Sequence, residues 1–434
     1  MSNVLTADSS DVVGAYRKID RHVLMFLAVA YAVAYVDRVN IGFAKLQMQQ
    51  ALSIGDAAYG FGAGVFFLGY MLFEIPSNQL LTRIGARLTL GRIMVLWGLA
   101  SMSTLLVTSS TGFYIARFCL GVFEAGFAPG MLFYLSRWYP RERLGRAIAL
   151  LLAAAPIGGV VAAPVSGWLL AHTNGVAGLA GWQWMFLVEG IPSVLLGCCA
   201  LTWLSESPAT ASWLTPSEKE MVRARLSDRQ PRREGWKELR AVLTDLGVYR
   251  LALIYFCLIC GVYVVGFWFP TILKASGVKS AVAVGWYSAV PYIGAVVGMY
   301  WLARRSDRLL ERRRHAGMAA AGSAIALTVA ALFVTQFAAA MVTMTIATAL
   351  AYAAYAVFWS MPADYLRPSE AASGTAFINS IGLFGGFLSP VIIGALKEAT
   401  GSTATGLFAI VVLLALGALL LLTGPDHRSE GETP

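Results

Sequence analysis

The sequence is poor in charged residues, and this shortage excludes most soluble folds. Asp, Glu, Lys and Arg make up 13% of the 434 residues, whereas a soluble domain carries about 25%. Hydrophobic residues make up 58%, and the mean hydropathy is +0.66. This composition predicts an all-α, polytopic membrane protein.

Cysteine and histidine are also scarce, with five Cys and four His. All five cysteines lie inside apolar runs, where we expect buried thiols and no disulfides. The histidines stand near helix ends or in loops, which argues against a histidine proton relay. Cys257-Leu258-Ile259-Cys260 has the spacing of a redox or metal pair, but no histidine or second pair accompanies it, so packing is the favoured interpretation. The sequence shows no nucleophile–base pair, no metal cluster and no cofactor motif. An enzyme or a membrane-bound sensor is therefore not expected.

Apolar runs of roughly 20 residues, the length that spans a bilayer, recur along the chain. The polar first 16 residues lead into the first run, which we expect to be retained as a span and not cleaved as a signal peptide. A longer polar segment, residues 205–249, separates six runs from six. The predicted domains are an N-terminal bundle (1–204), a basic cytoplasmic linker (205–249) and a C-terminal bundle with a short tail (250–434). The twelve runs cover about 22–44, 57–82, 88–108, 112–136, 146–171, 183–204, 250–273, 281–303, 316–336, 338–360, 373–396 and 404–423.

The basic residues predict the orientation of the chain. Most of the 33 Lys and Arg fall in the segments on one side, while the opposite segments hold Lys45, Lys274, Lys279 and Lys397. An excess of basic residues marks the cytoplasmic side. We therefore expect both termini in the cytoplasm. The net charge of +9 then reflects topology and indicates no nucleic-acid partner.

Matching features recur in the two halves of the chain. A basic loop with Arg83 and Arg87 follows the second run, and one with Arg304 and Arg308 follows the eighth. Two duplicated, pseudo-symmetric six-helix bundles, with a site at their interface, form a transporter architecture. We expect these four arginines to act in gating.

Small residues also repeat between the fifth and eleventh runs. They let helix backbones approach closely, and proline kinks a helix. Such helices suit two halves that rock against one another. The repeated residues are Gly158, Gly159, Pro164 and Gly167, and then Gly385, Gly386, Pro390 and Gly394.

The linker carries a clear helix start. Thr215-Pro216-Ser217-Glu218 has the spacing of a capping box with proline at the first helical position. We expect a helix to about Leu226, in a solvated connector that lies against the membrane surface.

The first apolar run contains Asp37 and Arg38 side by side. Each charge costs roughly 2.5–3.5 kcal/mol at mid-bilayer, so an intramembrane pair indicates a functional site. In the alternative, Arg38 extends to the interface and Asp37 merely caps the helix.

Two further buried charges, Arg117 and Glu124, lie in the fourth run. They are seven residues apart, so they share one helix face about 10 Å apart along the axis. Pairing of Asp37 with Arg117, or of Arg38 with Glu124, would reduce the cost of burial. Binding of an anion beside such a carboxylate would change its proton affinity. In the alternative, Glu124 belongs to a structural ion pair.

Polar groups in other runs complete the candidate cavity. Glu74 is either a gate or a packing contact, and Tyr70 lies one turn before it on the same face. The second half is poor in charge, and its candidates are Asn379 and Trp359. A single Asn in a bundle can equally form an interhelical hydrogen bond.

These motifs together resemble the anion:cation symporter family of the major facilitator superfamily, over nearly the whole chain. That family includes bacterial carriers for sugar acids, tartrate, phthalate and hydroxyphenylacetate. The loop after the second run lacks the usual aspartate, and Ala154-Ala155-Pro156 stands where sugar-acid members present an amide. The motifs are Tyr35-Val36-Asp37-Arg38-Val39-Asn40, Gly69-Tyr70 with Glu74-Ile75-Pro76, Arg117 with Gly121 and Glu124-Ala125-Gly126, Gly181-Trp182 with Glu189-Gly190, and Asn379-Ser380-Ile381-Gly382.

The resemblance implies roles for the buried residues. Arg38 would bind the substrate carboxylate, with Tyr35 and Tyr70 as hydrogen-bond partners. Asp37 and Glu124 would carry protons, and Arg117 would modulate Glu124. Asn379 would contact the substrate from the second half, and Trp359 would contribute to an aromatic wall.

We therefore expect a monomeric, multi-pass transporter of the bacterial cytoplasmic membrane. It would import an organic carboxylate, either aromatic or small and hydroxylated, together with protons by alternating access. Protons are the coupling ion, and no cofactor or metal is expected. The alternative is a proton-coupled exporter of drugs or metabolites.

Overall fold

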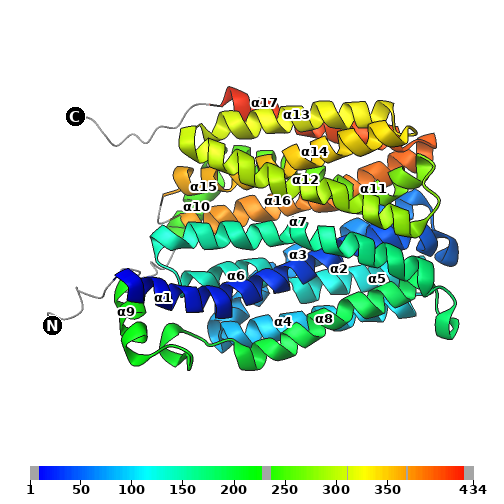
Figure 1. Cartoon of the computed structure of the whole chain (residues 1–434). Coiled ribbons are helices and arrows are strands. Elements are labelled where there is room, and N and C mark those ends of the chain that lie inside the picture. The colour runs from blue at the N-terminus through cyan, green and yellow to red at the C-terminus, as the bar shows by residue number, and fades with distance from the viewer. Residues whose placement is uncertain (1–8, 227–235, 310, 368–369, 425–434) are drawn as a thin grey trace. The chain divides into compact units, whose positions relative to one another are not determined.

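The computed structural model describes residues 9–226, 236–309, 311–367 and 370–424 (Figure 1). Twelve of its helices are long and apolar enough to cross a membrane. The prediction of an all-α polytopic protein is confirmed. The orientation of the termini stays a prediction.

The helices follow the apolar runs closely, with polar or glycine-containing turns between them. Short α1 precedes the first spanning helix, and α9 and α10 lie in the central linker. In chain order the helices are α1 (Ser9–Ile19), the π-helical turn η1 (Asp20–Leu24), α2 (Met25–Leu52), α3 (Asp56–Ile84), α4 (Ala86–Ser103), η2 (Thr104–Leu106), α5 (Ser110–Glu124), α6 (Phe127–Ser136), α7 (Arg141–His172), η3 (Val176–Gly178), α8 (Gly181–Trp203), η4 (Pro208–Thr210), α9 (Pro216–Leu226), α10 (Trp236–Thr244), α11 (Leu246–Ala275), α12 (Ala281–Leu309), α13 (Arg312–Leu332), α14 (Phe337–Phe358), α15 (Ser360–Tyr365), α16 (Ala371–Thr400) and α17 (Thr403–Thr423).

The chain forms two compact units. Unit 1 contains residues 1–38, 68–159 and 183–231, and unit 2 contains residues 39–67, 160–182 and 232–434. Helices α2, α3, α7 and α8 therefore contribute one part of their length to each unit. The division into bundles 1–204 and 250–434, taken from the sequence repeat, stays a prediction.

Unit 2 is held together by close backbone contacts between helices far apart in the sequence. A Cβ atom at Gly42 of α2 would overlap the carbonyl oxygen of Gly266 in α11. A Cβ atom at Gly60 of α3 would overlap the carbonyl oxygen of Pro390 in α16, and one at Gly394 of α16 would overlap that of Asp56. The small residues predicted in the eleventh run thus permit close approach.

The fourth apolar run is not the continuous helix that its composition suggests. Helix α5 ends at Glu124, and α6 begins at Phe127 after Ala125 and Gly126. Gly126 has φ of +84°, in the left-handed region that glycine adopts most easily. The equivalent run of the second half also changes helix, because α14 ends at Phe358 and α15 begins at Ser360.

Helix α2 extends beyond its predicted end near Ala44 and reaches Leu52. Lys45 was expected in an outer loop. It lies within this helix, and its side chain is 1% exposed. The loop assignment was wrong because the polar residues after Lys45 continue the helix.

The linker start is as predicted. The Thr215 backbone N–H donates to Glu218 Oε2 (2.8 Å), and the Glu218 backbone N–H donates to Thr215 Oγ1 (3.3 Å). Lys18 of α1 forms an ion pair with Glu218 at 2.8 Å. The capped helix α9 is thereby attached to α1.

The prediction that all five thiols are buried is confirmed only in part. Cys257 and Cys260 are buried in α11, but Cys198 and Cys199 of α8 are exposed. Apolar side chains on the outside of a membrane bundle are covered by lipid, so hydrophobicity did not distinguish the two environments.

Candidate functional site

Arg38 and Glu124 form a buried ion pair in unit 1. Arg38 Nε donates to Glu124 Oε1 at 2.7 Å, and Arg38 Nη2 contacts the same oxygen. The Arg38 side chain is 8% exposed and that of Glu124 is 0% exposed. Within the described residues, Glu124 Oε2 is buried and has no hydrogen-bond partner. This pairing, one of the two predicted, is confirmed.

Tyr70 of α3 lies beside the ion pair. The guanidinium carbon of Arg38 is 5.4 Å from the centre of the Tyr70 ring, within the range of a cation–π contact. Tyr70 is buried, and Tyr35 of α2 is also buried in the same unit. Of the predicted substrate-binding residues of the first half, Tyr70 therefore lies beside the Arg38 guanidinium, and Tyr35 lies on the same helix as Arg38.

The Asp37 carboxylate has partners that the sequence did not suggest. Ser101 Oγ donates to Oδ1 (2.6 Å), while Ser193 Oγ (2.8 Å) and Trp97 Nε1 (3.0 Å) donate to Oδ2. All four side chains are buried. Serine and tryptophan are common in membrane helices, and only the i, i+4 spacing of Trp97 and Ser101 was a visible signal.

Arg117 contacts Asp37 through the backbone. Its Nη1 donates to the Asp37 carbonyl oxygen at 3.5 Å, at the limit of a hydrogen bond. Arg117 and Glu124 are both fully buried on α5, as the shared helix face predicts. The carboxylate of Asp37 is thus surrounded by neutral donors, and a guanidinium contacts its main chain.

The break after α5 falls directly beside Glu124. A Cβ atom at Gly126 would lie 2.6 Å from Ser77 Oγ of α3. Interrupted membrane helices are tolerated where the freed backbone groups are buried in protein or line a cavity, and such helices build the sites of many transporters. The interruption places a carboxylate at a helix end, a position that sequence periodicity did not reveal.

The predicted gating residues of unit 1 have different environments. Glu74 is buried, whereas Arg83 is exposed near the end of α3. Arg87 lies in the first turn of α4, and its backbone N–H donates to Glu206 Oε1 at 3.1 Å. Glu206 therefore caps α4 in the loop where the sequence lacks the usual aspartate.

The predicted residues of the second half lie in unit 2. Trp359 joins α14 to α15, and its ring packs edge-on against Tyr255 with 4.8 Å between ring centres. Asn379 is half-buried on α16. Arg304 and Arg308 are exposed on α12, with the Arg304 guanidinium 4.3 Å from the Tyr300 ring centre.

The architecture and the buried charges can be compared with known proteins. The family model of the Major Facilitator Superfamily matches residues 27–390 and 251–434. The chain belongs to the Major Facilitator Superfamily. It is therefore a membrane transporter and not an enzyme, and it is a multi-pass protein of the bacterial inner membrane.

Individual members of the superfamily cover almost the whole chain. A putative tartrate transporter of Agrobacterium vitis is 43% identical over 94% of this chain and 90% of its own length. A quinolone resistance transporter of Acinetobacter baumannii is 38% identical over 91% of each chain. The putative tartrate transporter is consistent with the anion:cation symporter resemblance.

A solved structure shows the same fold. The inward-facing, unoccupied form of a bacterial homologue of the human lysosomal transporter Spinster matches with a TM-score of 0.76 at 19% identity. The alignment covers 92% of this chain and 96% of that one. At this identity the likeness concerns the major facilitator fold alone.

Proposed function

We propose that this transporter imports an organic carboxylate anion together with protons, as a monomer and by alternating access. Arg38 binds the substrate carboxylate, Glu124 and Asp37 bind protons, and Arg117 modulates Glu124. Tyr35 and Tyr70 contact the substrate in the first half, and Asn379 and Trp359 in the second. Glu74 and the loop residues Arg83, Arg87, Arg304 and Arg308 take part in gating.

The buried Arg38–Glu124 pair is the observation that carries this proposal. A guanidinium is permanently charged and presents a planar fork that fits a carboxylate. Its Nε and Nη2 both contact Glu124 Oε1. A substrate carboxylate and the Glu124 carboxylate therefore compete for the same donors.

This competition couples substrate binding to proton binding. A bound substrate anion releases Glu124 from Arg38, and an uncompensated buried carboxylate takes up a proton. Protonated Glu124 in turn leaves Arg38 available to the substrate. The two events favour one another, as linkage requires.

The substrate class follows from the charge and from the relatives. One relative is named as a putative tartrate transporter, and tartrate is a compact, hydroxylated carboxylate. The aromatic side chains near Arg38 and Trp359 also suit aromatic acids. We propose carboxylates of these two kinds.

Uptake into proteoliposomes tests the proposal. Purified protein is reconstituted, and accumulation of labelled tartrate, phthalate and hydroxyphenylacetate is followed with and without an imposed inward proton gradient. We expect at least one acid to accumulate only with the gradient. If no carboxylate accumulates, the substrate class is wrong.

Export of drugs is the second candidate, favoured by the relative named as a quinolone resistance transporter. An exporter would also need buried carboxylates. The direction of flux distinguishes the two, because an exporter accumulates its substrate in everted vesicles energised with acid inside. Quinolone accumulation without carboxylate uptake would favour export.

A further inference from the structure

The two oxygens of the Asp37 carboxylate have chemically different partners. Oδ2 accepts from the Trp97 indole N–H (3.0 Å) and from the Ser193 hydroxyl (2.8 Å), whereas Oδ1 accepts from the Ser101 hydroxyl (2.6 Å). Trp97 and Ser101 lie on α4, and Ser193 lies on α8. All of these side chains are buried, so water would not replace a partner that a substitution removes.

The difference matters when the carboxylate binds a proton. An indole N–H can only donate, while a hydroxyl can donate or accept by rotation. A proton on Oδ2 could be accepted by Ser193 after its hydroxyl rotates, but the Trp97 N–H would then have to donate to a protonated oxygen, which is a poor acceptor. A proton on Oδ1 faces Ser101, whose hydroxyl can rotate from donor to acceptor.

The charged groups around Asp37 do not reverse this asymmetry. Arg38, next along α2, contacts Glu124. Arg117 of α5 donates to the Asp37 backbone carbonyl oxygen. Glu124 of α5 is itself held by Arg38. The choice between Oδ1 and Oδ2 therefore depends on the three neutral donors.

We propose that the coupling proton binds Asp37 on Oδ1 and that Ser101 is the positioning residue that accepts it. One O–H bond forms on Oδ1, the Ser101 hydroxyl turns to accept a hydrogen bond from it, and Trp97 and Ser193 continue to donate to Oδ2. No other bond changes. This inference rests on the proposed role of Asp37 in proton coupling.

The pH dependence of proton-driven uptake tests it in three variants. In Trp97→Phe and Ser193→Ala the ionised carboxylate loses a donor, so the pH midpoint of uptake moves up by roughly one unit. In Ser101→Ala the ionised form loses a donor and the protonated form loses its acceptor. The midpoint therefore moves up less than in the other two variants. Ser101→Thr, which keeps the hydroxyl, restores the wild-type midpoint.

An upward shift in Ser101→Ala as large as that in Ser193→Ala would overturn the assignment of Oδ1. Asp37→Asn separates this failure from failure of the proposed function. If Asp37→Asn still accumulates substrate above the external concentration when a proton gradient is imposed, Asp37 is not the proton site at all. If it does not, while the serine variants behave alike, only the role of Ser101 is wrong.

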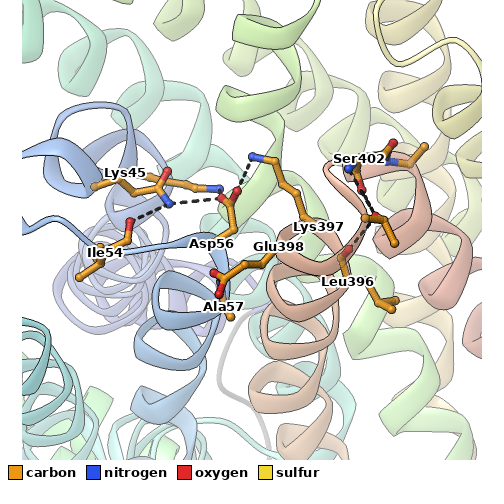
Figure 2. Close-up of polar contacts among 11 residues, drawn as sticks. Lys45, Ile54, Asp56, Ala57, Leu396, Lys397, Glu398 and Ser402 are labelled. Atoms are coloured by element: carbon orange, nitrogen blue, oxygen red, sulfur yellow. Dashed lines mark hydrogen bonds and ion pairs between the residues drawn. The ribbon is translucent and has the colours of Figure 1, made fainter.

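A different observation, in unit 2, carries a second inference. Figure 2 shows Asp56, at the start of α3, between two lysines from different helices. Lys45 of α2 contacts Asp56 Oδ1 at 2.6 Å, and Lys397 of α16 contacts Oδ2 at 2.9 Å. Beside them, Glu398 Oε2 accepts from the Ala57 backbone N–H at 2.8 Å.

Within this cluster the Lys45 side chain is buried among aromatic rings, whereas the side chains of Asp56 and Lys397 are 21% and 20% exposed. Lys45 Nζ lies 3.7 Å from the Trp268 ring centre and 4.6 Å from that of Tyr59. One turn further along α3, Gly60 packs against the Pro390 carbonyl of α16. Residues Lys397 and Glu398 both come from the second half of the sequence repeat, while Lys45 and Asp56 come from the first.

We infer that Lys45, Asp56 and Lys397 form an ionic lock that keeps the predicted outer ends of the two halves closed. Opening on this side separates Lys397 and Glu398 from Asp56 and Ala57. It also withdraws Lys45 from the Trp268 face. Loss of Asp56 leaves the buried Lys45 charge uncompensated, so the lock favours the closed arrangement. This inference rests on alternating access but not on any particular substrate or coupling ion.

A cysteine reporter tests the lock. Ala63 of α3 is fully buried beside Gly60 and Gly64. In a background without the five native cysteines, Ala63→Cys is treated with a membrane-impermeant methanethiosulfonate from one side at a time. We expect Asp56→Asn and Lys397→Gln to raise the labelling rate from the outer side about tenfold, which corresponds to about 1.4 kcal/mol in the opening equilibrium.

Two controls make the result specific. Lys397→Arg keeps a cation at this position, and its Ala63→Cys reporter should be labelled at the same rate as in the parent protein. Glu311→Gln removes the exposed Glu311–Arg314 pair of the same unit and should also leave labelling unchanged. Unchanged labelling in both lock variants, with normal gel-filtration profiles, would overturn the inference. Because labelling needs neither substrate nor proton gradient, this outcome is independent of the proposed function.

Discussion

Arg38 contacts Glu124 through two nitrogens, and both meet the same oxygen, Oε1. The second carboxylate oxygen, Oε2, has no hydrogen-bond partner among the residues that the structure describes. Arginine–carboxylate pairs are frequently bidentate, with one N–H donating to each oxygen. Here both nitrogens share one oxygen, and in the proposed mechanism a substrate carboxylate takes its place.

Replacing Arg38 should therefore remove substrate binding. Truncating one partner of a buried charge pair costs roughly 2–5 kcal/mol, so Arg38→Ala should lower substrate affinity at least about 30-fold. Arg38→Lys keeps the charge but loses the fork, and should bind more weakly than wild type. Ligand-induced thermal shift on the purified protein measures both.

Arg314→Ala is the matched control for this experiment. Arg314 is exposed and forms a surface pair with Glu311, a kind of contact worth about 0–1 kcal/mol. The Arg314→Ala variant should bind substrate with the same affinity as wild type. Normal substrate binding by Arg38→Ala would show that the anion site lies elsewhere.

Gly126 should be intolerant of a side chain. A non-glycine residue in the left-handed region costs about 1–3 kcal/mol, and a Cβ atom there would also crowd Ser77. Gly126→Ala should lower the free energy of unfolding by at least this amount and reduce transport. Thermal unfolding in detergent and uptake measure the two effects.

Gly145 offers the comparison within the same unit. It lies inside α7, and nothing would lie within 4 Å of its Cβ atom. Alanine is favoured over glycine in a helix by roughly 0.5–1 kcal/mol, so Gly145→Ala should be neutral or stabilising. Equal behaviour of the two variants would mean that the break after Glu124 has no strict conformational requirement.

The helices were predictable because each span needs a long apolar run, and such runs are visible without any knowledge of packing. The Arg38–Glu124 pair was predicted as one of two alternatives, since opposite charges at similar depth lower each other's burial cost. The partners of Asp37 were not. Ser101, Ser193 and Trp97 are ordinary residues in membrane helices, and their convergence depends on how α4 and α8 pack against α2.

Two further features depend on backbone geometry that periodicity does not record. Gly126 interrupts the fourth span, although glycine is frequent within membrane helices and usually leaves them intact. Lys45 was assigned to a loop because it follows the apolar run. Its burial requires both that α2 continues to Leu52 and that Asp56 and Trp268 meet it.

The attachment of the linker to α1 should depend on pH. Partial burial of Glu218 tends to raise its pKa, but the hydrogen bonds from Lys18 and Thr215 and the charge of Lys18 together lower the pKa below its usual value. A lowered pKa in the folded state means that the stabilisation is present above the unfolded pKa of about 4.5 and is lost as pH falls through the folded pKa.

A double-mutant cycle of Lys18→Ala and Glu218→Ala measures this contribution. Because Lys18 is 43% exposed, the coupling free energy should be only about 0.2–1 kcal/mol at pH 7. It should decrease as the pH falls below about 4.5 and approach zero once Glu218 is protonated in the folded state. A coupling that stays unchanged throughout this acid titration would show that packing, and not charge, connects α9 to α1.

Asp37 and Arg38, although adjacent, should respond differently to substitution. Asparagine resembles a protonated aspartate in size and charge, and its amide can donate to Ser101 while its carbonyl accepts from Trp97 and Ser193. Asp37→Asn should therefore keep substrate binding and exchange of external for internal substrate. It should lose accumulation driven by a proton gradient, so that internal substrate rises only to the external concentration.

Counterflow and gradient-driven uptake in the same proteoliposomes measure the two activities, with Arg38→Ala inactive in both. If Asp37→Asn also fails to bind substrate, the carboxylate serves to hold α2 against α4 and α8, and the coupling proton must be carried by Glu124 alone.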